Sequence, residues 1–528
     1  MQHHQLRLST LSPVHIGAGD SMDPFSYFIA SGNLYCLDQF NLVNDLSEIQ
    51  RKQLDELIDN TGSDNNSEQT LIRLQRFFHD NRQALYGCVH TIRPLHQAIE
   101  GYYQNKLALQ TKQHAQSKLT ISEITKSAYK GTPYVPGSSL KGAIRTVLSN
   151  DLLQANDSWN SKSKNIEKHL YNYDNASSDP FKALRIGDFS MTEVIYPEVV
   201  FVSSISKKED SPNPTMPTLV EVLPAGIIQA IQGDLVVNPN HLTEELTAET
   251  LQLSNLFKSL NRFYLPKLTK ELSLYQRQQT SQYAYSDKKF AWAEKIHELI
   301  ADLQSEFNNG KLALMRIGRY AGGEYKTWDK LRKIDVSPRG NRGVKKFAQS
   351  ATTRWLCNPE SKDRGGALPL GWILLSETNT EVPLAIKNFS QLSAIWAHKC
   401  QQSATELDTL KQDQQDRKLK QQQSKLAQEQ KLKQKQEAEF QRQSLSTEDK
   451  IIHDLYQQLE TDKQAKNHDS TQELRQLLNR AVQSAEQLSN SDYTDKVRQA
   501  YQDCINWWQI NDKKNKKLKA LRSKLNGL

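Results

Sequence analysis

The sequence predicts an α+β protein that ends in an all-α extension. Nearly all of its glycines lie within the first 380 residues, where strand-like runs and helical patterns follow one another without the regular alternation that a parallel sheet requires. From about residue 385 onward the spacing of apolar residues is helical almost throughout. These observations place a core at 1–384, a polar Gln/Lys-rich linker or long helix at 385–446, and a small helical bundle at 447–528.

The composition excludes several classes of protein. The 528 residues carry 68 Lys and Arg against 60 Asp and Glu, a mild excess that identifies no partner by itself. Five cysteines are scattered and never spaced as CxxC, which argues against a disulfide framework or a zinc knuckle and fits a reducing cytoplasm. No run of about 18 apolar residues and no signal-peptide pattern occurs, so we expect a cytoplasmic protein without membrane contact.

The core begins with a strand in which Leu6, Leu8 and Leu11 alternate with polar residues until Pro13 breaks the pattern. Runs of β-branched and aromatic residues indicate further strands, and apolar residues at helical spacing indicate helices. The predicted strands are 33–38, 198–207 and 218–237, with a turn or bulge at LPAG inside the last run. The predicted helices are 67–85, 138–153 and 290–307, and 308–325 is expected to run from a turn through a strand into a glycine loop.

The helix expected to start near residue 137 combines an apolar stripe with a cationic one. Gly137, Ser138 and Ser139 place unpaired backbone N–H groups and hydroxyls at the positive end of the helix dipole, where a phosphate would fit. Lys141 and Arg145 lie one and two turns further on, beside the packed stripe. The alternative is that a serine merely caps the helix and both cations are solvated. No Walker loop is present.

A glycine loop follows the first strand and carries His15 beside Gly17 and Gly19. The loop lacks the third glycine of a dinucleotide fingerprint. Its glycines allow a ligand to approach the backbone closely, and His15 could stack on a base or donate to a phosphate. A lone histidine in such a place can equally be structural, and both interpretations stay open at this point.

Residues 311–346 are the strongest electrostatic signal in the chain, with eleven Lys and Arg against three Asp and Glu. Tyr320, Tyr325 and Trp328 are interleaved with these cations and offer surfaces for unstacked bases. We expect Arg316, Arg319 and Lys326 to contact RNA, with an affinity that falls steeply with salt. The alternative is a surface loop that is basic for solubility.

The sequence contains no catalytic constellation. It has no HExxH, no Gly-x-Ser-x-Gly and no compact His/Cys/Asp cluster with metal-ligand spacing, so we expect no metal and no cofactor. Asp20, Asp23 and Asp188 could serve as metal-binding carboxylates in RNA cleavage, but each also fits a turn.

The region beyond the core divides into a polar tract and three amphipathic patterns. The leucines of 401–446 are too sparse for a coiled-coil seam, which favours a solvated helix or disorder. Ser446 with Asp449, and Ser470 with Glu473, have capping-box spacing. Three helical stripes then indicate a small bundle. They are Ile451, Leu455 and Leu459; Leu474, Leu478, Val482 and Ala485; and Tyr493, Val497, Tyr501 and Trp508. The last segment, KKNKKLKALRSKL, could touch nucleic acid or form a solvated face.

Four segments taken together resemble the RAMP proteins of type III CRISPR-Cas systems, and most of all the family of the fifth Csm subunit. They are SPVHIGAGD, YVPGSSLKGAIRTVL, RIGRYAGGEYKTW and LPLGWILL, and the resemblance spans about residues 1–380. In this resemblance Gly17 and Gly19 match the first glycine loop. The helix start matches at Gly137, Ser138, Ser139 and Lys141, and the late glycine loop at Arg316, Gly318, Gly322 and Gly323. Residues 385–528 depart from the usual pattern.

The resemblance implies a ferredoxin-like, RRM-type core of the Cas-seven group with insertions. It implies a noncatalytic subunit that binds CRISPR RNA, caps the filament near the 3′ end of the guide, and supports guide maturation and antiviral defence. The implied partners are Cas-seven-like backbone subunits, a small subunit and, indirectly, target RNA.

Two other hypotheses remain. The chain could be a metal-independent endoribonuclease of the Cas-six kind, with His15 or His114 as general acid or base. Its helical extension could be an arm that contacts another subunit or a maturation nuclease.

Overall fold

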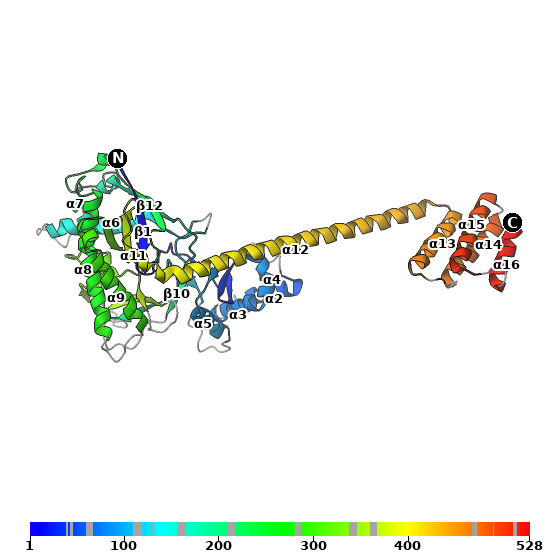
Figure 1. The fold of residues 1–528 in the computed structure, drawn as a ribbon, viewed down its shortest axis with the longest axis horizontal. Helices are drawn as coiled ribbons and strands as arrows, with labels where there is room; N and C mark the ends of the chain where they lie inside the picture. The colour runs from blue at the N-terminus through cyan, green and yellow to red at the C-terminus, as the bar shows by residue number, and fades with distance from the viewer. Residues whose placement is uncertain are drawn as a thin grey trace. The chain divides into compact units, whose positions relative to one another are not determined.

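The computed structural model describes residues 1–38, 41–42, 46–59, 67–108, 119–127, 131–155, 165–207, 217–279, 287–336, 346–358, 367–466, 468, 472–488, 490–510 and 515–528. The chain forms two compact units, Met1–Asp413 and Gln414–Leu528, and each is described by itself (Figure 1).

A seven-stranded sheet forms the centre of the first unit. Its strand order is β13-β18-β1-β12-β9-β7, and β8 also pairs with β12. Every pair in it is antiparallel. The strands are β1 (Gln2–Thr10), β7 (Tyr134–Val135), β8 (Leu184–Ile186), β9 (Phe189–Met191), β12 (Ile231–Val237), β13 (Leu312–Arg316) and β18 (Trp372–Glu377).

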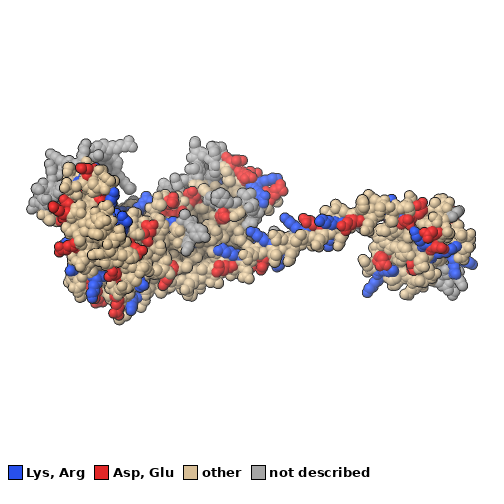
Figure 2. All heavy atoms as spheres, turned by 90° about the horizontal axis from the view of Figure 1, so that it is seen from above, with Lys and Arg blue, Asp and Glu red and all other residues tan. Residues whose placement is uncertain are grey.

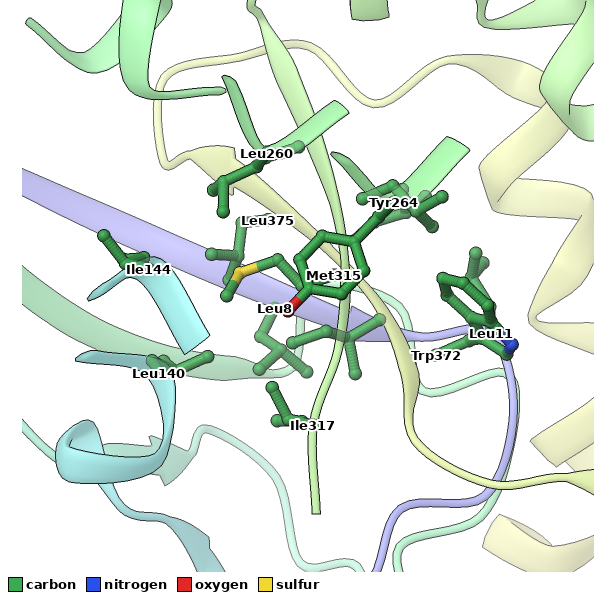
Figure 3. Close-up of a cluster of buried hydrophobic side chains, with 14 of the residues drawn as sticks. Leu8, Leu11, Leu140, Ile144, Leu260, Tyr264, Met315, Ile317, Trp372 and Leu375 are labelled. Atoms are coloured by element: carbon green, nitrogen blue, oxygen red, sulfur yellow. The ribbon is translucent and has the colours of Figure 1, made fainter. Parts of the chain in front are cut away.

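Helices α6 (Gly137–Ala155) and α8 (Leu253–Gln279) pack on this sheet, and α8 runs beside α9 (Asp287–Asp302) (Figure 1). The main core lies where side chains of α6, α8, β1, β13 and β18 converge (Figure 3). Leu8, Leu140, Leu260, Met315 and Leu375 are each at most 2% exposed. Because apolar side chains come from strands and helices distant in sequence, this core fixes the loops that connect them.

A second sheet and a satellite domain complete the first unit. The second sheet has the order β17-β16-β10-β11-β6-β2, a three-stranded sheet has the order β3-β4-β5, and β14 pairs with β15 in a separate two-stranded sheet. The strands are β2 (Ser21–Met22), β3 (Tyr27–Ala30), β4 (Asn33–Leu37), β5 (Val89–Pro94), β6 (Ile121–Ser122), β10 (Glu198–Ser206), β11 (Thr218–Val222), β14 (Ile334–Asp335), β15 (Phe347–Ala348), β16 (Thr353–Asn358) and β17 (Leu368–Pro369). The helices are α2 (Glu48–Asp59), α3 (Ser67–Asp80), α4 (Arg82–Leu85), α5 (Gln97–Ala108), α7 (Ile166–Leu170), α10 (Gln304–Asn308) and α11 (Leu384–Phe389). The 3₁₀ turns are Tyr86–Cys88, Pro180–Ala183, Pro239–His241 and Gly323–Tyr325.

The long helix α12 (Gln391–Ser444) begins packed against the first unit. The Trp396 indole donates to the Tyr196 carbonyl at 3.0 Å, and Leu407 is buried in the core of the three-stranded sheet. Beyond these contacts Leu419, Leu426 and Leu432 are each more than half exposed. The polar tract is therefore a solvated helix, one of the two predicted states, rather than disorder.

The second unit contains a four-helix bundle made of α13 (Thr447–Gln464), α14 (Gln472–Leu488), α15 (Ser491–Trp508) and α16 (Lys516–Asn526). The three predicted stripes lie in or against one core, and Ser446 caps α13 by accepting from the Asp449 N–H at 3.0 Å. The basic final segment adds the fourth helix by burying Leu518, Leu521 and Leu525. Ser470 lies outside the described residues. Among the described residues no helix is long and apolar enough to cross a membrane.

Candidate nucleic-acid interface

The N-terminus of α6 already holds an anion that belongs to the protein. The Gly137 N–H donates to Asp188 Oδ1 at 2.9 Å, at the place where the sequence predicts a phosphate. A Cβ atom on Gly137 would clash with the carbonyl oxygens of Ile186 and Gly187, so only glycine allows the helix to start this close to the β8–β9 turn. Ser138 is exposed and Ser139 half-buried. A phosphate would have to bind beside Asp188 rather than in its place.

The two predicted cations of α6 have different environments. Arg145 binds Glu167, donates to Asp179 Oδ2 at 2.7 Å and to the Tyr173 hydroxyl at 2.8 Å, and its side chain is 22% exposed. This side chain therefore clamps α6 to the segment 167–179, and its charge is already balanced. The structure removes Arg145 from the set of cations available to a ligand, because two carboxylates and a hydroxyl occupy its donors.

The side chain of Lys141, by contrast, has no ion pair or hydrogen bond among the described residues. Partial burial lowers its pKa, and the positive charges of Arg145 and Arg185 act in the same direction, while the negative charge of Asp179 offsets part of the effect. Arg185 lies on β8, is exposed, and also lacks an ionic partner within the described ranges. A nearby anion would relieve the repulsion between these cations, so Lys141 and Arg185 form the available part of this surface.

His15 is buried, at 1% exposure. Its Nδ1 donates to the Glu221 carbonyl at 2.7 Å, and its ring packs on Tyr320 with centroids 5.4 Å apart. The Arg319 N–H donates to the His15 carbonyl at 2.9 Å, which joins the two glycine loops. This geometry favours the structural interpretation of His15 over RNA contact, and it keeps the ring away from a scissile RNA bond.

The glycines of the two loops also differ in role. A Cβ atom on Gly17 would lie 2.8 Å from His15 Nε2, whereas Gly19 has φ +104° and open space around it. Gly322 likewise has φ +94°, a backbone conformation that residues other than glycine rarely adopt. Gly19 can therefore admit a ligand, while Gly17 is required by the packing of His15.

A buried ion cluster lies beside the loop that carries His15. The Glu221 carboxylate is fully buried and binds Arg93, Lys126 Nζ at 2.7 Å and the Ile124 N–H at 3.1 Å. Burial alone would raise the pKa of Glu221, but the charges of Arg93 and Lys126 overcome it and hold the pKa below its usual range. The cluster fixes β11 against β5, and both of its cations already share a carboxylate.

Arg316 is a structural residue rather than an exposed RNA contact. Its guanidinium is 3% exposed, donates to Glu271 Oε2 at 2.8 Å and to the Leu370 carbonyl at 2.9 Å, and lies 4.1 Å from the Tyr325 ring centroid. Glu271 also accepts from the Trp372 indole at 2.8 Å. The expectation that Arg316 touches RNA fails in this geometry because its donors face the core.

Arg319 and Lys326 remain exposed on the late glycine loop. Arg319 lies over the Tyr320 ring at 5.7 Å and has no ion pair within the described ranges. Lys326 Nζ donates only weakly, to the Arg319 carbonyl at 3.4 Å, and desolvation followed by the Arg316 charge lowers its pKa. Gly322 and Gly323 lie between them and line a cleft.

The cleft has a volume of about 330 Å³ and lies between α8, the late glycine loop and β16. Tyr320, Tyr325 and Trp355 are its aromatic residues. Six cations and only two acids line it, namely Lys207, Lys267, Lys270, Arg316, Arg332 and Arg354 with Glu271 and Glu324. Figure 2 shows Lys and Arg interspersed with Asp and Glu over the face that it draws.

Sequence reasoning missed several residues of this interface. Lys207, Lys270, Arg354 and Trp355 come from three segments that only the fold brings together. The pairing of a cation with an aromatic residue at Arg354 and Trp355 is a signal that could have been noticed. His114 and the cations Arg339, Arg342 and Lys345 lie outside the described residues.

The alternative carboxylate site does not assemble. Among the described residues no group of three His, Cys, Asp or Glu could hold a metal ion. Asp188 caps α6, and the Asp23 carbonyl accepts the Ser26 N–H in a turn at 3.0 Å. The turn interpretation of Asp23 and Asp188 therefore agrees with the structure, and the exposed Asp20 accepts the Glu123 N–H with its carbonyl at 3.1 Å.

Comparison with known proteins finds one family and several similar chains. The model of the RAMP superfamily matches residues 7–272. A curated relative from Streptococcus thermophilus, "CRISPR system Cms protein Csm5", is 32% identical over 151 residues, which are 28% of this chain and 38% of the relative's length. A chain of a Csm–crRNA–target RNA ternary complex of a type III-A CRISPR-Cas system is 18% identical, with a TM-score of 0.47 over 71% of this chain and 100% of that chain. The crystal structure of T. onnurineus Csm5 is 18% identical, with a TM-score of 0.42 over 70% and 99%.

Proposed function

The chain belongs to the RAMP superfamily, and on this premise we propose that it is a noncatalytic RNA-binding subunit of a type III CRISPR-Cas ribonucleoprotein. It binds CRISPR RNA and caps the filament near the 3′ end of the guide, in support of guide maturation and antiviral defence. Its partners are Cas-seven-like backbone subunits, a small subunit and, through the guide, target RNA. The similarity to the Csm5 of S. thermophilus supports the type III assignment.

The strand order supports a ferredoxin-like core for this subunit. In the central sheet β18, β1, β12 and β9 are neighbours in that order, and all their pairings are antiparallel. Helix α6 lies in the connection from β1 to β9, and α8 follows β12. This is the order of a β-α-β-β-α-β unit with its fourth strand beside its first, and β13 adds one strand at the edge.

One observation carries the proposal of RNA binding. The described residues include four cations without an ion pair around the glycine-rich motifs and the cleft, and each comes from a different element. They are Lys141 on α6, Arg185 on β8, Lys270 on α8 and Arg319 on the late glycine loop. Because an unpaired cation gains most from a phosphate, this set is the natural contact for an RNA backbone.

Salt-dependent filter binding tests the proposal. We expect the full chain to bind single-stranded CRISPR RNA with an affinity that falls steeply with salt, and the triple variant Lys141→Ala/Arg185→Ala/Arg319→Ala to bind more weakly. The slope of log affinity against log salt should flatten by about 0.7 for each phosphate of a single strand that the variant no longer neutralises.

A matched control removes the same charge elsewhere. Lys258, Lys295 and Lys311 are exposed and lie outside the lining of the cleft, so Lys258→Ala/Lys295→Ala/Lys311→Ala should keep both affinity and slope. An affinity that does not depend on salt, or an equal loss of affinity in both triple variants, would show that Lys141, Arg185 and Arg319 are not the RNA contact.

The noncatalytic assignment has its own test. Purified protein is incubated with CRISPR repeat RNA, with and without divalent metal. We expect intact RNA, because His15, the candidate base that lies within the described residues, is buried against the Glu221 carbonyl. Cleavage that follows the protein through purification would contradict the assignment.

A further inference from the structure

The acids of the cleft between α8 and β16 are already neutralised by other lining residues. Glu271 binds the buried Arg316. Glu324 binds Lys207 with Oε1 and Nζ 2.6 Å apart, and also accepts the Ala351 N–H at 2.9 Å. Neither carboxylate is therefore free to repel an incoming anion.

The remaining lining residues leave an excess of positive charge. Lys267 and Arg332 share a single carboxylate, that of Asp329. Lys270 is exposed, and its side chain has no hydrogen bond or ion pair among the described residues. Burial lowers the pKa of Lys267, which means that its charged form loses hydration in the folded protein. An anion in the cleft would stabilise this charged form.

An aromatic wall closes one side of the cleft. Trp355 is half-buried, and its ring lies 5.2 Å from that of Tyr320, which in turn packs on His15 at 5.4 Å. The inner rings hold Trp355 in place while part of it faces the cleft. A held indole beside a cation is a stacking surface for a nucleobase.

We propose that this cleft binds a nucleoside phosphate, with the base stacked on Trp355 and the phosphate bound by Lys270. The volume of about 330 Å³ is at the small end of the roughly 300–1,000 Å³ of ligand pockets, which suits one nucleotide. The ligand comes either as a free nucleotide or as one unstacked nucleotide of an RNA strand, and the second source rests on the proposed function. The inference assigns a base-and-phosphate pocket that is separate from the cations at the start of α6.

Isothermal titration calorimetry of the full chain tests both sources. The probes are adenosine 5′-monophosphate, adenosine, inorganic phosphate and a short single-stranded oligoadenylate. We expect the monophosphate or the oligoadenylate to bind more tightly than adenosine or phosphate alone. Lys270→Ala and Trp355→Ala should each weaken that binding by about tenfold, and Trp355→Phe should keep most of it.

The control is Lys258→Ala, which removes another exposed lysine of α8 and should bind as the parent does. Far-UV circular dichroism and thermal unfolding of each variant distinguish a binding defect from a folding defect. Binding of the monophosphate that needs both residues supports a free ligand, and binding of the oligoadenylate alone that needs both supports a strand. If inorganic phosphate binds as well as the nucleotide, or if neither variant weakens binding, the pocket is overturned.

The outcome also separates this pocket from the proposed function. If no nucleotide binds and RNA binding is unchanged in Lys270→Ala and Trp355→Ala, the proposed nucleotide pocket is contradicted and the proposed RNA-binding function is not. Nucleotide binding in a protein that binds no CRISPR RNA would do the reverse.

Discussion

The buried guanidinium of Arg316 links two elements of the first unit by hydrogen bonds. It joins Glu271 of α8 to the backbone of the β17–β18 turn through Leu370, and the carboxylate of Glu271 also accepts from Trp372. Both charged groups are less than 5% exposed. Removing one partner of such a buried pair leaves an uncompensated charge in the core, whereas removing both charges does not.

We therefore expect Arg316→Met to lower the free energy of unfolding by about 3–5 kcal/mol. The double variant Arg316→Met/Glu271→Gln should regain much of this loss, because the glutamine oxygen can still accept from Trp372 while no charge is buried. Calorimetry of the Met1–Asp413 transition measures both. A double variant less stable than the single one would show that the acid has another role.

His15 gives the first unit a predictable response to acid. Burial lowers its pKa from the ordinary 6.5, and Arg319 acts in the same direction, so the folded state takes up a proton less readily than the unfolded chain. The unfolded state then binds more protons below about pH 6.5, and stability falls as the pH falls through that value. The slope due to one histidine is at most about 1.4 kcal/mol per pH unit.

In His15→Gln we expect a shallower loss of stability as the pH falls below about 6.5, because glutamine can donate to the Glu221 carbonyl without titrating. The pKa of His90 is also lowered by burial, and this residue is unchanged in the variant, so the difference between the two proteins isolates His15. Urea unfolding at a series of pH values measures the two slopes. Equal slopes would mean that His15 titrates normally in the folded protein.

At the scale of the residue, the sequence did not show which predicted cations and helix ends are already occupied by the protein's own carboxylates. The start of α6 does bind an anion, but the anion is Asp188, which is 51 residues away in sequence. Arg145 and Arg316 lie beside aromatic rings, but each also forms an ion pair with a carboxylate that is distant in sequence. The pairing of distant charges depends on the tertiary fold and has no local pattern.

At the scale of the element, helix α6 contains two glycines with opposite roles. Gly137 starts the helix against the Ile186 and Gly187 carbonyls, where a Cβ atom would clash. Gly142 lies within the same helix and has no atom within 4 Å of a Cβ position. The two positions therefore form a matched pair in one element.

We expect Gly137→Ala to destabilise the first unit by about 1–3 kcal/mol, because the clash pushes α6 away from the β8–β9 turn. Gly142→Ala should stabilise it by about 0.5–1 kcal/mol, since alanine loses less backbone entropy in a helix. Thermal unfolding measures both variants. Equal effects of the two substitutions would show that α6 can shift without cost.

The strength of a local pattern decided which elements could be predicted. The strands 33–38, 198–207 and 218–237 and the helices 67–85 and 138–153 all appear, with boundaries that differ by a few residues. The run 218–237 is divided into two strands where LPAG was expected to form a turn or bulge. Helix α8 was missed, although Leu256, Leu260 and Tyr264 have helical spacing, and Pro266 lies inside it. A proline in the interior of a helix is rare, and it weakens a helix prediction from the spacing of apolar residues alone. In the structure the helix continues through Pro266 because its apolar residues pack in the core.

At the scale of the molecule, an α+β region followed by helices was predictable because glycine and β-branched residues concentrate before residue 385. The boundaries 1–384, 385–446 and 447–528 stay a prediction. The structure adds a physical reason to treat the last segment as a folding unit of its own. Its core consists of α13, α14, α15 and α16 residues alone, and Leu455, Leu474, Leu478 and Val497 are fully buried in it.

We expect the fragment 447–528 to fold without the rest of the chain into a helical monomer that unfolds cooperatively, because its buried side chains contact one another. Leu478→Ala in the fragment should cost about 2–5 kcal/mol, as for other buried leucines. Leu488→Ala, on the same helix but 43% exposed, should cost little. Urea unfolding followed by circular dichroism at helix wavelengths measures both. A fragment without a cooperative transition, or equal losses at the two leucines, would mean that this core needs the long helix to form.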